Sequence, residues 1–586
     1  MREEACSAPG TQTLAGRSAG AGLMPQPSAR SKWWGWGQEG ESYHLPDPER
    51  FWAYLRERLG ETSPTPRLDS LSEVALNASR VSPGVLAALT AAAGPEGVST
   101  EAAGRACFSL GKGYKDLVRI RRGEIPNPTD VVVRPRSEET VLEVLRIAAR
   151  ERLAVVPFGG GTSVVGGVEP AAGRPTITLD LAELSRPLAI DNRSATATVQ
   201  AGMMGPDLER FLNPAGFTLG HFPQSFMYST VGGWIATRSA GQNSTRYGTI
   251  AERVQSLRLA HPEGVLHTPD VPAAAAGPDL VQMIAGSEGT LGVITQASLK
   301  LAPLPPHQDY RGYLLPSFAE GVEAARELMQ SGLAPAVLRL SDEAETASTL
   351  ALRAAPRGLA AAAEGAARWY LARKGLRLES GSIMILGFEG RQAEVRRDRD
   401  VAKAILRRHG GASLGRGPGR AWRRGRYEAP YLRDLLLDRG VMIDTLETAT
   451  VWDRYLPLHA AVRDGLRDAL GERSVVMAHL SHSYTDGGSI YYTFLAPQEP
   501  GAELEQWDRV KAAATDVIVR NGGALSHHHG IGVEHRPWME RYLGEQGARW
   551  LAAVKAALDP GDILNPGKLV PQPASAGAPS PEGGDV

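Results

Sequence analysis

The stretch Pro157-Phe158-Gly159-Gly160-Gly161-Thr162-Ser163 follows directly on an apolar run, residues 153–156, that is typical of a buried strand. Consecutive glycines after a strand let the backbone turn tightly with positive φ. They also leave the backbone N–H groups uncovered, and bare amides beside the hydroxyls of Thr162 and Ser163 form a concave site for an anion. Taken alone, the stretch predicts a phosphate or pyrophosphate site and a plain surface turn equally well.

Two later stretches have the same character: Ser229-Thr230-Val231-Gly232-Gly233-Trp234 and Gly286-Ser287-Glu288-Gly289-Thr290-Leu291-Gly292. The triple-glycine stretch has neither the Gly-Lys-Ser/Thr of a Walker loop nor the G-x-G-x-x-G of a Rossmann turn. Three such loops within one segment are less expected by chance than one. A large dinucleotide that touches several loops accounts for all three together.

Size and composition limit the class of protein. A chain of 586 residues is long enough for roughly three to four domain-sized units. The net charge of −1 offers no electrostatic basis for binding nucleic acid. Two cysteines, Cys6 and Cys107, are too few for a disulfide scaffold, so we expect a reducing, cytoplasmic setting. The first thirty residues lack the apolar core of a signal peptide, and no apolar run approaches the length of about 18 residues that spans a bilayer.

The element pattern predicts an α+β fold. A strand at 130–133, a helix capped by Ser137 that runs to about residue 152, and the strand before the glycines form a βαβ unit. Pro303-Leu304-Pro305-Pro306 is a stiff linker and a plausible domain boundary. Strands and helices then alternate, which predicts one antiparallel sheet with helices on one face. We also expect a hairpin at 254–268, an Ala-rich helical stretch that runs to about residue 374, and an irregular stretch after Gly440.

A run of histidines is the sharpest feature of the second half: Ser526-His527-His528-His529-Gly530. Acid–base chemistry or contact with a cofactor is the favoured interpretation, ahead of structural packing. A metal has the least support, because adjacent side chains diverge on a strand or loop and no ligand cluster at metal spacing lies nearby in the sequence.

Three more residues are candidates for chemistry. Tyr491 and Tyr492 lie on a predicted strand and therefore point to opposite faces, so one can face a pocket while the other packs. Arg339 lies on an otherwise apolar strand, and a buried arginine needs an anionic partner, either a carboxylate or a ligand. Arg433 is less distinctive, and a structural ion pair is its simplest interpretation.

These motifs carry a family resemblance. The three glycine loops resemble the FAD-binding segments of the vanillyl-alcohol oxidase flavoprotein superfamily. Within it, four further features look like the alkyldihydroxyacetonephosphate synthase (alkylglycerone-phosphate synthase) family, over about residues 32–570: Trp34-Gly35-Trp36-Gly37, Thr237-Arg238-Ser239-Ala240-Gly241, Glu447-Thr448-Ala449 with Trp452-Asp453-Arg454, and the triple histidine.

The resemblance implies an α+β architecture with a two-subdomain PCMH-type FAD-binding domain and an α/β substrate (cap) domain built on an antiparallel sheet. The expected boundaries are a disordered tail at 1–31, a mostly helical segment at 32–127, the FAD-binding domain at 128–305, the substrate domain at 306–500, a C-terminal helical segment completing the active site at 501–570, and a disordered tail at 571–586.

The implied activity is an exchange without net redox change: the acyl chain of acyl-dihydroxyacetone phosphate is replaced by a long-chain alcohol, through an adduct at flavin N5. The alternative is an FAD-linked 2-hydroxy acid oxidase or dehydrogenase of the same fold; a flavin-binding protein without catalysis is the third. The stretch Gln242-Asn243-Ser244-Thr245-Arg246 departs from the eukaryotic pattern of the family, and the terminal Gly-Gly-Asp-Val is unlike a peroxisomal signal, so we expect a bacterial cytoplasmic enzyme in peripheral contact with the membrane. The resemblance is compatible with a homodimer.

The resemblance assigns the site residue by residue. It places the acid–base tyrosine at Tyr491, the histidine cluster at His527, His528 and His529, a further essential arginine at Arg339, and the phosphate-binding arginine at Arg433. It implies no metal. Thr162 stands where relatives with covalently attached flavin carry histidine, so non-covalent FAD is expected. The implied FAD contacts are Pro157, Phe158, Gly159, Gly160, Gly161, Thr162, Ser163, Gln224, Ser225, Phe226, Met227, Tyr228, Ser229, Thr230, Thr237, Arg238, Ser239, Ala240, Glu288, Gly289, Thr290, Leu291, Gly292, Val293 and Ile294.

Overall fold

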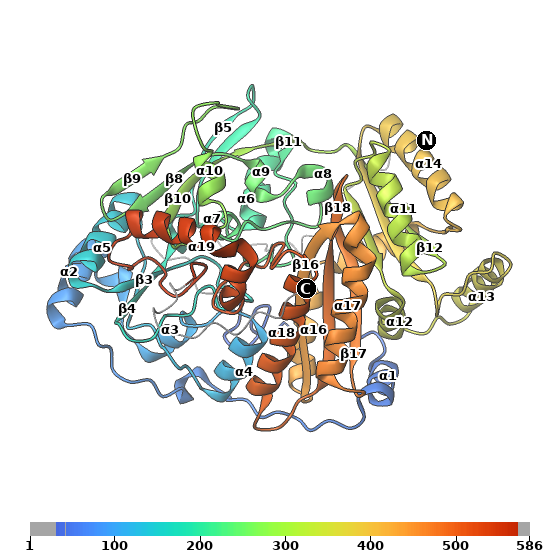
Figure 1. Cartoon of the computed structure of the whole chain (residues 1–586), viewed down its shortest axis with the longest axis horizontal. Helices are drawn as coiled ribbons and strands as arrows, with labels where there is room; N and C mark the ends of the chain where they lie inside the picture. Colours follow the sequence, from blue (N-terminus) through green and yellow to red (C-terminus); the bar gives the residue numbers. More distant parts are fainter. Residues whose placement is uncertain (1–30, 42, 572–586) are drawn as a thin grey trace, which may run out of the picture.

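The computed structural model describes residues 31–41 and 43–571, so the expected tails lie outside it except for Ser31 and Pro571. Figure 1 shows the earlier part of the chain, in blue and green, beside the later part in yellow and orange. The C-terminal helix α19 (Met539–Leu558), in red, returns across the earlier part. Of the helices in the described ranges, none combines the length and the apolar character needed to cross a bilayer.

The first sheet contains the predicted βαβ unit. Its order is β1 (Val98–Ser99), β2 (Val131–Val133), β4 (Thr176–Asp180), β3 (Ala154–Phe158), and the last three strands are parallel. Helix α5 (Glu138–Glu151) connects β2 to β3, and the Ser137 hydroxyl accepts the Thr140 N–H at its start. Its apolar side is buried against the sheet, so this part of the sequence prediction is confirmed.

A second, antiparallel sheet completes the earlier part. Its strands, in spatial order, are β5 (Pro187–Asp191), β6 (Thr196–Gln200), β10 (Val293–Lys300), β8 (Val254–His261) and β9 (Gly264–His267). The predicted hairpin at 254–268 is β8 and β9. Short elements fill the space around this sheet: β7 (Phe217–Thr218), β11 (Ala302–Pro303), α6 (Gly205–Leu212), α7 (Val231–Ala236), α8 (Ser244–Tyr247), α9 (Ile250–Arg253) and α10 (Leu280–Ile284).

The later part is built on a seven-stranded sheet in which every paired strand is antiparallel, as predicted. Its order is β15 (Ala412–Gly415), β12 (His307–Leu315), β14 (Ser382–Gly390), β13 (Val337–Ser341), β17 (Val475–Ser483), β18 (Gly487–Pro497), β16 (Val441–Val451). One face packs against α11 (Phe318–Gln330), α14 (Gln392–Arg408), α17 (Trp452–Leu470) and α18 (Glu503–Arg520).

The opposite face of this sheet is also partly covered, which corrects the expectation of helices on one face. Three helices pack there over a smaller apolar cluster: α1 (Pro48–Leu59), α12 (Glu343–Leu352) and α16 (Ala429–Leu437). Because α1 comes from the N-terminal segment, the cover was not visible in the local strand–helix alternation. The other helices of that segment are α2 (Pro83–Ala93), α3 (Ala102–Cys107) and α4 (Tyr114–Arg122), and α15 (Arg416–Gly425) precedes α16.

Two predictions of secondary structure were wrong. The stretch after Gly440 is not irregular but forms β16, paired along its whole length with β18. Its alternation was hidden because Thr445 and Glu447, on the side away from the main core, are polar. The Ala-rich stretch up to about residue 374 is not one helix: it divides into α12 and α13 (Leu359–Ala372), with Pro356 and Gly358 between them.

Candidate active site

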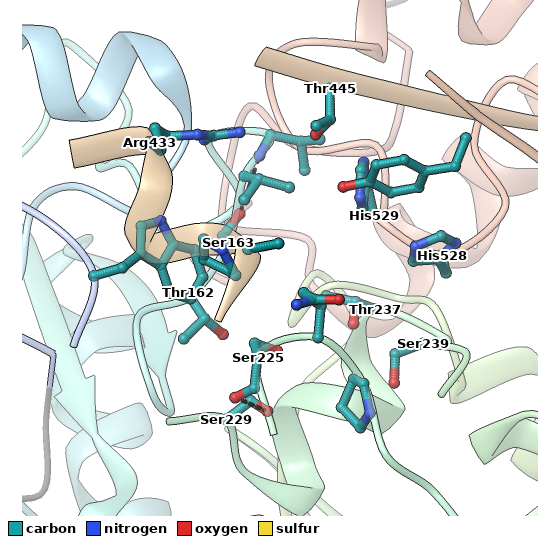
Figure 2. A pocket seen from close by; sticks show the side chains of 18 of the residues that line it. Thr162, Ser163, Ser225, Ser229, Thr237, Ser239, Arg433, Thr445, His528 and His529 are labelled. Carbon is teal, nitrogen blue, oxygen red and sulfur yellow. Dashed lines mark hydrogen bonds between the residues drawn. The ribbon is translucent and has the colours of Figure 1, made fainter. Parts of the chain in front are cut away.

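A cavity of about 510 Å³ lies where the glycine loops of the earlier part face the seven-stranded sheet. Its volume falls within the range of about 300–1,000 Å³ that is usual for small-molecule sites. In Figure 2 small hydroxyl side chains from the earlier part gather at one side, while Arg433, Thr445, His528 and His529 lie at the other.

Strand alternation decides which side chains of the sheet reach this cavity. Successive residues of a strand point to opposite faces. Tyr492 is fully buried in the main core, whereas Tyr491 lines the cavity, so the prediction that the two tyrosines diverge is confirmed. The cavity-lining residues of β13, β17, β18 and β16 follow the same period, except for His482, which comes after an irregularity in the pairing of β17 with β18. The residues that keep the period are Val337, Arg339, Ile443, Thr445, Val475, Met477, His479, Ser481, Tyr491, Thr493 and Leu495.

The triple-glycine loop is shaped by close backbone approach more than by positive φ. Only Gly161 of the three has positive φ, at 67°, which corrects the reason given for Gly159 and Gly160. A Cβ on Gly160 would lie 1.7 Å from the Tyr228 carbonyl oxygen, and one on Gly159 would lie 2.4 Å from Thr230 Oγ1. The first two glycines are therefore required because the loop packs directly on residues 228–230.

Most of the expected FAD contacts lie on the cavity wall: Pro157, Gly159, Gly160, Gly161, Thr162, Ser163, Gln224, Ser225, Ser229, Thr230, Thr237, Ser239, Ala240, Glu288, Gly289, Gly292 and Ile294. The others do not line it: Phe158, Phe226, Met227, Tyr228, Arg238, Thr290, Leu291 and Val293.

Local contacts explain why the remaining predicted residues do not line the cavity. The Phe158 ring packs on Phe108, 4.9 Å between centroids, because its neighbour Pro157 takes the cavity side of the strand. Met227 faces solvent, and the Arg238 guanidinium donates to the backbone oxygen of Ala285 at 3.1 Å. A prediction that names every residue of a stretch as an FAD contact includes too many, because alternate side chains point away from the cavity.

The wall built by the earlier part fits a dinucleotide. It offers hydroxyls from three separate loops, labelled in Figure 2 as Thr162, Ser163, Ser225, Ser229, Thr237 and Ser239. Beside them run glycines whose missing side chains leave the backbone exposed to a ligand. Donors of this kind suit phosphate and ribose oxygens, so the residues present fit FAD.

The histidine loop is held in place by a buried carboxylate, Glu447 of β16. This carboxylate accepts the backbone N–H groups of three successive residues: His527 at 2.5 Å, His528 at 3.1 Å and His529 at 2.9 Å. It also accepts the Ser526 hydroxyl at 2.7 Å. Burial alone would raise the pKa of Glu447, but the histidines and these N–H groups hold it well below its usual value. Glu447 therefore stays ionised and sets the position of the loop.

A second carboxylate, Glu288, holds the far end of the same loop. It accepts the N–H groups of Ile531 at 2.5 Å and Gly532 at 2.7 Å. Burial raises the pKa of Glu288 to about 6. Glu288 was expected to contact FAD, and it does line the cavity, but its hydrogen bonds show that it also joins the earlier part of the chain to the histidine loop.

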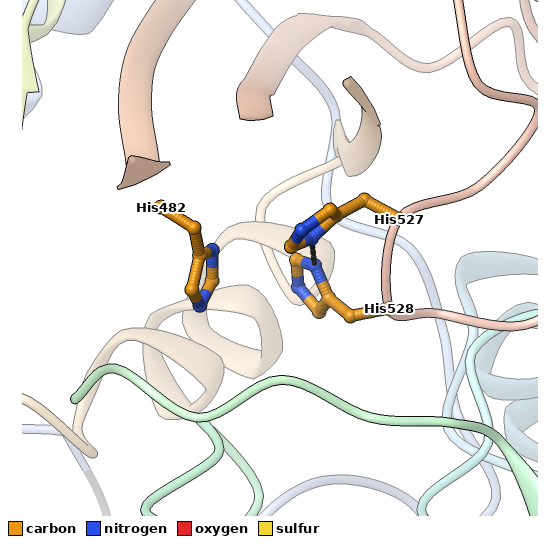
Figure 3. Close-up of side chains that lie close together, drawn as sticks. All are labelled: His482, His527 and His528. Carbon is orange, nitrogen blue, oxygen red and sulfur yellow. Dashed lines mark hydrogen bonds between the residues drawn. The ribbon is translucent and has the colours of Figure 1, made fainter. Parts of the chain in front are cut away.

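The three histidines do not diverge as expected. Adjacent ring centroids are 5.2 Å apart for His527 and His528 and 4.7 Å apart for His528 and His529. The structure also brings His482 of β17 against them, and one nitrogen from each of His482, His527 and His528 lies within 4.8 Å of the others (Figure 3). The distance in sequence had concealed this cluster.

The nitrogens of the cluster have hydrogen-bond partners. His482 Nε2 lies 2.9 Å from the Gly241 carbonyl oxygen, and its Nδ1 lies 3.2 Å from the Ser489 hydroxyl. His527 Nδ1 lies 2.9 Å from His528 Nδ1, and His527 Nε2 lies 2.6 Å from the Tyr484 hydroxyl. Burial lowers the pKa of both His527 and His528 to about 4, so both are neutral near pH 7.

Tyr491 lies among imidazoles, as its expected role requires. Its ring stacks on His479 at 4.9 Å and on His528 at 6.0 Å, and it meets the edge of His529 at 5.5 Å. Burial raises the pKa of Tyr491, while a hydrogen bond with Thr445 and the charge of Arg433 partly offset the increase. The residue is therefore a neutral phenol near pH 7 and can donate a proton.

Both candidate arginines line the cavity, and both already have an acidic partner. Arg339 donates to Glu345 at 2.6 Å and contacts His479 Nε2 at 3.0 Å. Arg433 donates to Asp444 at 2.9 Å and to the Lys112 carbonyl oxygen at 3.1 Å. The carboxylate partner named as one alternative for Arg339 is thus present, and so is the structural pair named for Arg433. Neither pair removes the arginine from the cavity wall.

Several residues of the site were missed from the sequence: Glu345, Asp444, His479, His482 and Tyr484. Glu447 was quoted as part of a family motif but without a role. Alternation along 475–483 could have pointed to His479, which shares the face of Met477. No local signal marks Glu447, because its partners lie about 80 residues away.

Comparisons with known proteins agree with this geometry. A family model described as "FAD binding domain" matches residues 129–269, and one described as "FAD linked oxidases, C-terminal domain" matches residues 304–569. An alkyldihydroxyacetonephosphate synthase of Trypanosoma brucei brucei is 36% identical over 485 residues, which cover 82% of this chain and 79% of that protein.

A solved structure described as alkyldihydroxyacetonephosphate synthase superposes with a TM-score of 0.80 at 30% identity, covering 92% of this chain and 99% of the other. A glycolate oxidase subunit of Bacillus subtilis is 26% identical over 478 residues, which cover 81% of this chain and 94% of that protein. The likeness is therefore greater to the synthases than to this oxidase subunit.

Proposed function

The chain belongs to the alkyldihydroxyacetonephosphate synthase family, and on that basis we propose that it replaces the acyl chain of acyl-dihydroxyacetone phosphate with a long-chain alcohol, releasing a fatty acid. FAD is its cofactor. When bound, FAD supplies an electron-accepting ring that activates the substrate carbon for exchange. The absence of a histidine at position 162 supports non-covalent attachment.

The observation that carries this proposal is an apolar arm of the same cavity. Away from the glycine loops, the wall is formed by side chains of α1, α12, α16 and the sheet: Phe51, Leu55, Leu352, Leu436, Ile443, Val475, Met477 and Leu495. A hydroxy acid of two or three carbons is too short to cover such an apolar surface. A long hydrocarbon chain can cover it, and burying each CH₂ group is favourable by about 0.8 kcal/mol.

Arg433 is suited to hold the phosphate end of the substrate. Its bonds to Asp444 and to the Lys112 carbonyl oxygen use two of the five N–H donors of a guanidinium. The remaining donors can reach a phosphate monoester in the cavity. Asp444 fixes the guanidinium, since it also accepts the Trp507 indole N–H at 2.6 Å. We propose that Arg339 of β13, which Glu345 holds in place, also orients the substrate.

The tyrosine and the histidines can handle the one proton that the exchange releases. Neutral His528 can accept the proton of the incoming alcohol, and the Tyr491 phenol can donate a hydrogen bond to the leaving oxygen, so that the fatty acid departs as a carboxylate and Tyr491 keeps its proton. From His528 the proton can pass to His527 and then to the half-buried Tyr484, along the two hydrogen bonds that join these residues. Two of the three imidazoles of Figure 3, His527 and His528, serve this transfer, while His482 packs against both, and no metal takes part in the proposal.

A spectroscopic experiment tests the proposed exchange. Purified holoprotein is mixed anaerobically with palmitoyl-dihydroxyacetone phosphate without alcohol, and the flavin absorbance is followed, with D-lactate and glycolate in parallel. We expect bleaching by the acyl phosphate, reversed by hexadecanol with release of palmitate. Bleaching by a hydroxy acid alone, reversed by an electron acceptor, would instead place the chain among the hydroxy acid oxidases.

Tyr491→Phe is the matching variant. It should retain FAD and abolish exchange, whereas Tyr542→Phe, at an exposed tyrosine of α19, should be without effect. Exchange that survives in Tyr491→Phe would refute the assigned role.

The proposal extends to the setting of the enzyme. Long-chain substrates reside in membranes, so we place the chain in the bacterial cytoplasm in peripheral contact with a bilayer. A homodimer is proposed from the family resemblance alone.

A further inference from the structure

Helix α13 projects from the body of the molecule at the side that carries α1 and α12 (Figure 1). It presents the two neighbouring aromatic side chains Trp369 and Tyr370, whose exposed fractions are 62% and 47%. Tyr542 and Trp550 of α19 are about as exposed, so exposure alone does not mark a contact surface. What sets the α13 pair apart is the charge that surrounds it.

The same segment carries an excess of positive charge. Residues 353–379 contain six cationic side chains, Arg353, Arg357, Arg368, Arg373, Lys374 and Arg377, and two acidic ones, Glu364 and Glu379. The net charge is thus +4 in a chain whose total is −1. Both acids pair with Arg368, so the other five cations remain for an external partner. All six cationic side chains are exposed.

Cations and aromatic rings are held next to each other on this helix. The Arg373 guanidinium lies 4.9 Å from the Trp369 ring, and the Lys374 ammonium lies 5.2 Å from the Tyr370 ring. Leu371 and Leu376 are buried in a small cluster with Leu314 and Ala412, which ties the C-terminal end of α13 to the sheet. The helix is therefore anchored at its C-terminal end, while residues 365–370 are exposed.

The position of α13 connects it to the apolar arm of the active-site cavity. It follows α12 after a six-residue link, and Ser348, Thr349 and Leu352 of α12 line that arm. Helix α1 lies across α12, where the Tyr54 hydroxyl contacts the Ser348 hydroxyl at 2.7 Å. The exposed surface and the wall of the chain-binding arm thus belong to adjoining elements.

We propose that α13 docks the protein onto a lipid bilayer that carries anionic headgroups, so that the chain-binding arm of the cavity lies next to the membrane. The inference rests on the proposed function, which requires substrates that partition into bilayers. Trp and Tyr rings settle at the headgroup level of a membrane, and adjacent Lys and Arg add attraction to anionic lipid. The predominance of alanine on the rest of the helix offers few large side chains to a protein partner.

Vesicle flotation tests the docking. The full-length FAD-loaded protein is mixed with phosphatidylcholine vesicles with or without 30% phosphatidylserine. We expect flotation with the anionic vesicles, reduced by high salt. Trp369→Ala/Tyr370→Ala should lower binding because it removes the two rings that settle at the headgroup level, and Arg373→Glu/Lys374→Glu because it reverses two of the charges that attract anionic lipid; we expect each to weaken binding by about tenfold or more. A matched control, Tyr542→Ala/Trp550→Ala, removes equally exposed aromatics of α19 and should float like the parent.

Two outcomes would overturn the inference: no flotation of the parent protein, or α13 variants that float as well as the parent. Exchange is then measured with substrates dispersed in detergent, where the α13 variants should match the parent. Flotation without exchange would refute the proposed function and leave the docking intact. Exchange without flotation would refute the docking alone.

Discussion

At position 160 the chain has no room for a side chain. The Cβ of Gly160→Ala would lie 1.7 Å from the Tyr228 carbonyl oxygen, so the glycine loop would have to move away from residues 228–230. We expect this variant to fold but to lose at least nine-tenths of its flavin, measured as the ratio of absorbance at 450 and 280 nm. Gly84→Ala, in α2 with open space around it, should keep full occupancy. Normal flavin content in Gly160→Ala would mean that the loop does not hold the cofactor.

The hydroxyl of Tyr484 should matter for turnover although it lies behind the cavity. Tyr484→Phe removes the partner of His527 Nε2 at the end of the proposed proton path. We expect kcat to fall by roughly tenfold or more, with FAD content unchanged and with an altered solvent isotope effect. An unaltered kcat would show that protons leave the site another way. Tyr542→Phe again serves as the surface control.

At the scale of the element, the histidine loop depends on β16. Glu447→Gln keeps the shape of the side chain but replaces one acceptor oxygen with an NH₂ group that faces backbone N–H donors. It also removes the charge that raises the pKa of His528 and His529. We expect exchange to fall about 100-fold, because small displacements of catalytic groups have effects of this size.

A second measurement separates this role from a merely structural one. The acidic limb of the pH–rate profile should move to lower pH in Glu447→Gln, since the histidines become harder to protonate. FAD content should be unchanged, and Glu505→Gln, at an exposed site on α18, should resemble the parent. An acidic limb at the same pH as in the parent would show that Glu447 acts only by stabilising the loop.

The same element shows how far the sequence could be interpreted. Helix α5, the glycine loop and the alternation of Tyr491 and Tyr492 were predictable because their signals are local: a cap, a turn and a period of two. Strand β16 was missed because Thr445, which lines the cavity, and Glu447, which holds the histidine loop, interrupt its apolar pattern. Residues that serve the site therefore weaken the apolar alternation from which their own strand could have been predicted.

At the scale of the molecule, the cavity exists only where distant parts of the chain meet. Glu288 and the histidine loop are 243 residues apart and are joined by two hydrogen bonds. His482 reaches the carbonyl oxygen of Gly241 across 241 residues. No window of sequence contains both members of such pairs. The family resemblance assigned several of these residues, but their mutual contacts required the fold.

The whole molecule should be sensitive to acid because it buries neutral histidines. Burial lowers the pKa of six of them to about 3 or 4: His221, His459, His527, His528, His529 and His535. Their unfolded value is about 6.5. Between pH 6.5 and 4 the unfolded chain therefore binds more protons, and each histidine lowers the stability by up to about 1.4 kcal/mol per pH unit as the pH falls.

Six buried carboxyl groups oppose this trend. Burial raises the pKa of Glu288, Asp342 and Glu534 to about 6, 7 and 8, and it also raises the pKa of Asp116, Glu209 and Asp434, so the folded state takes up protons at these groups first and gains stability as the pH falls. Burial lowers the pKa of His479 and His482 as well, so eight histidines act against six carboxyls, and the apparent Tm of the holoprotein should fall between pH 6.5 and 4.5. His459 lies outside the cavity, and the glutamine of His459→Gln cannot be protonated, so the Tm of this variant should fall less steeply as the pH is lowered. A flat Tm across this range, or the same slope in both proteins, would contradict the neutral state assigned to these histidines.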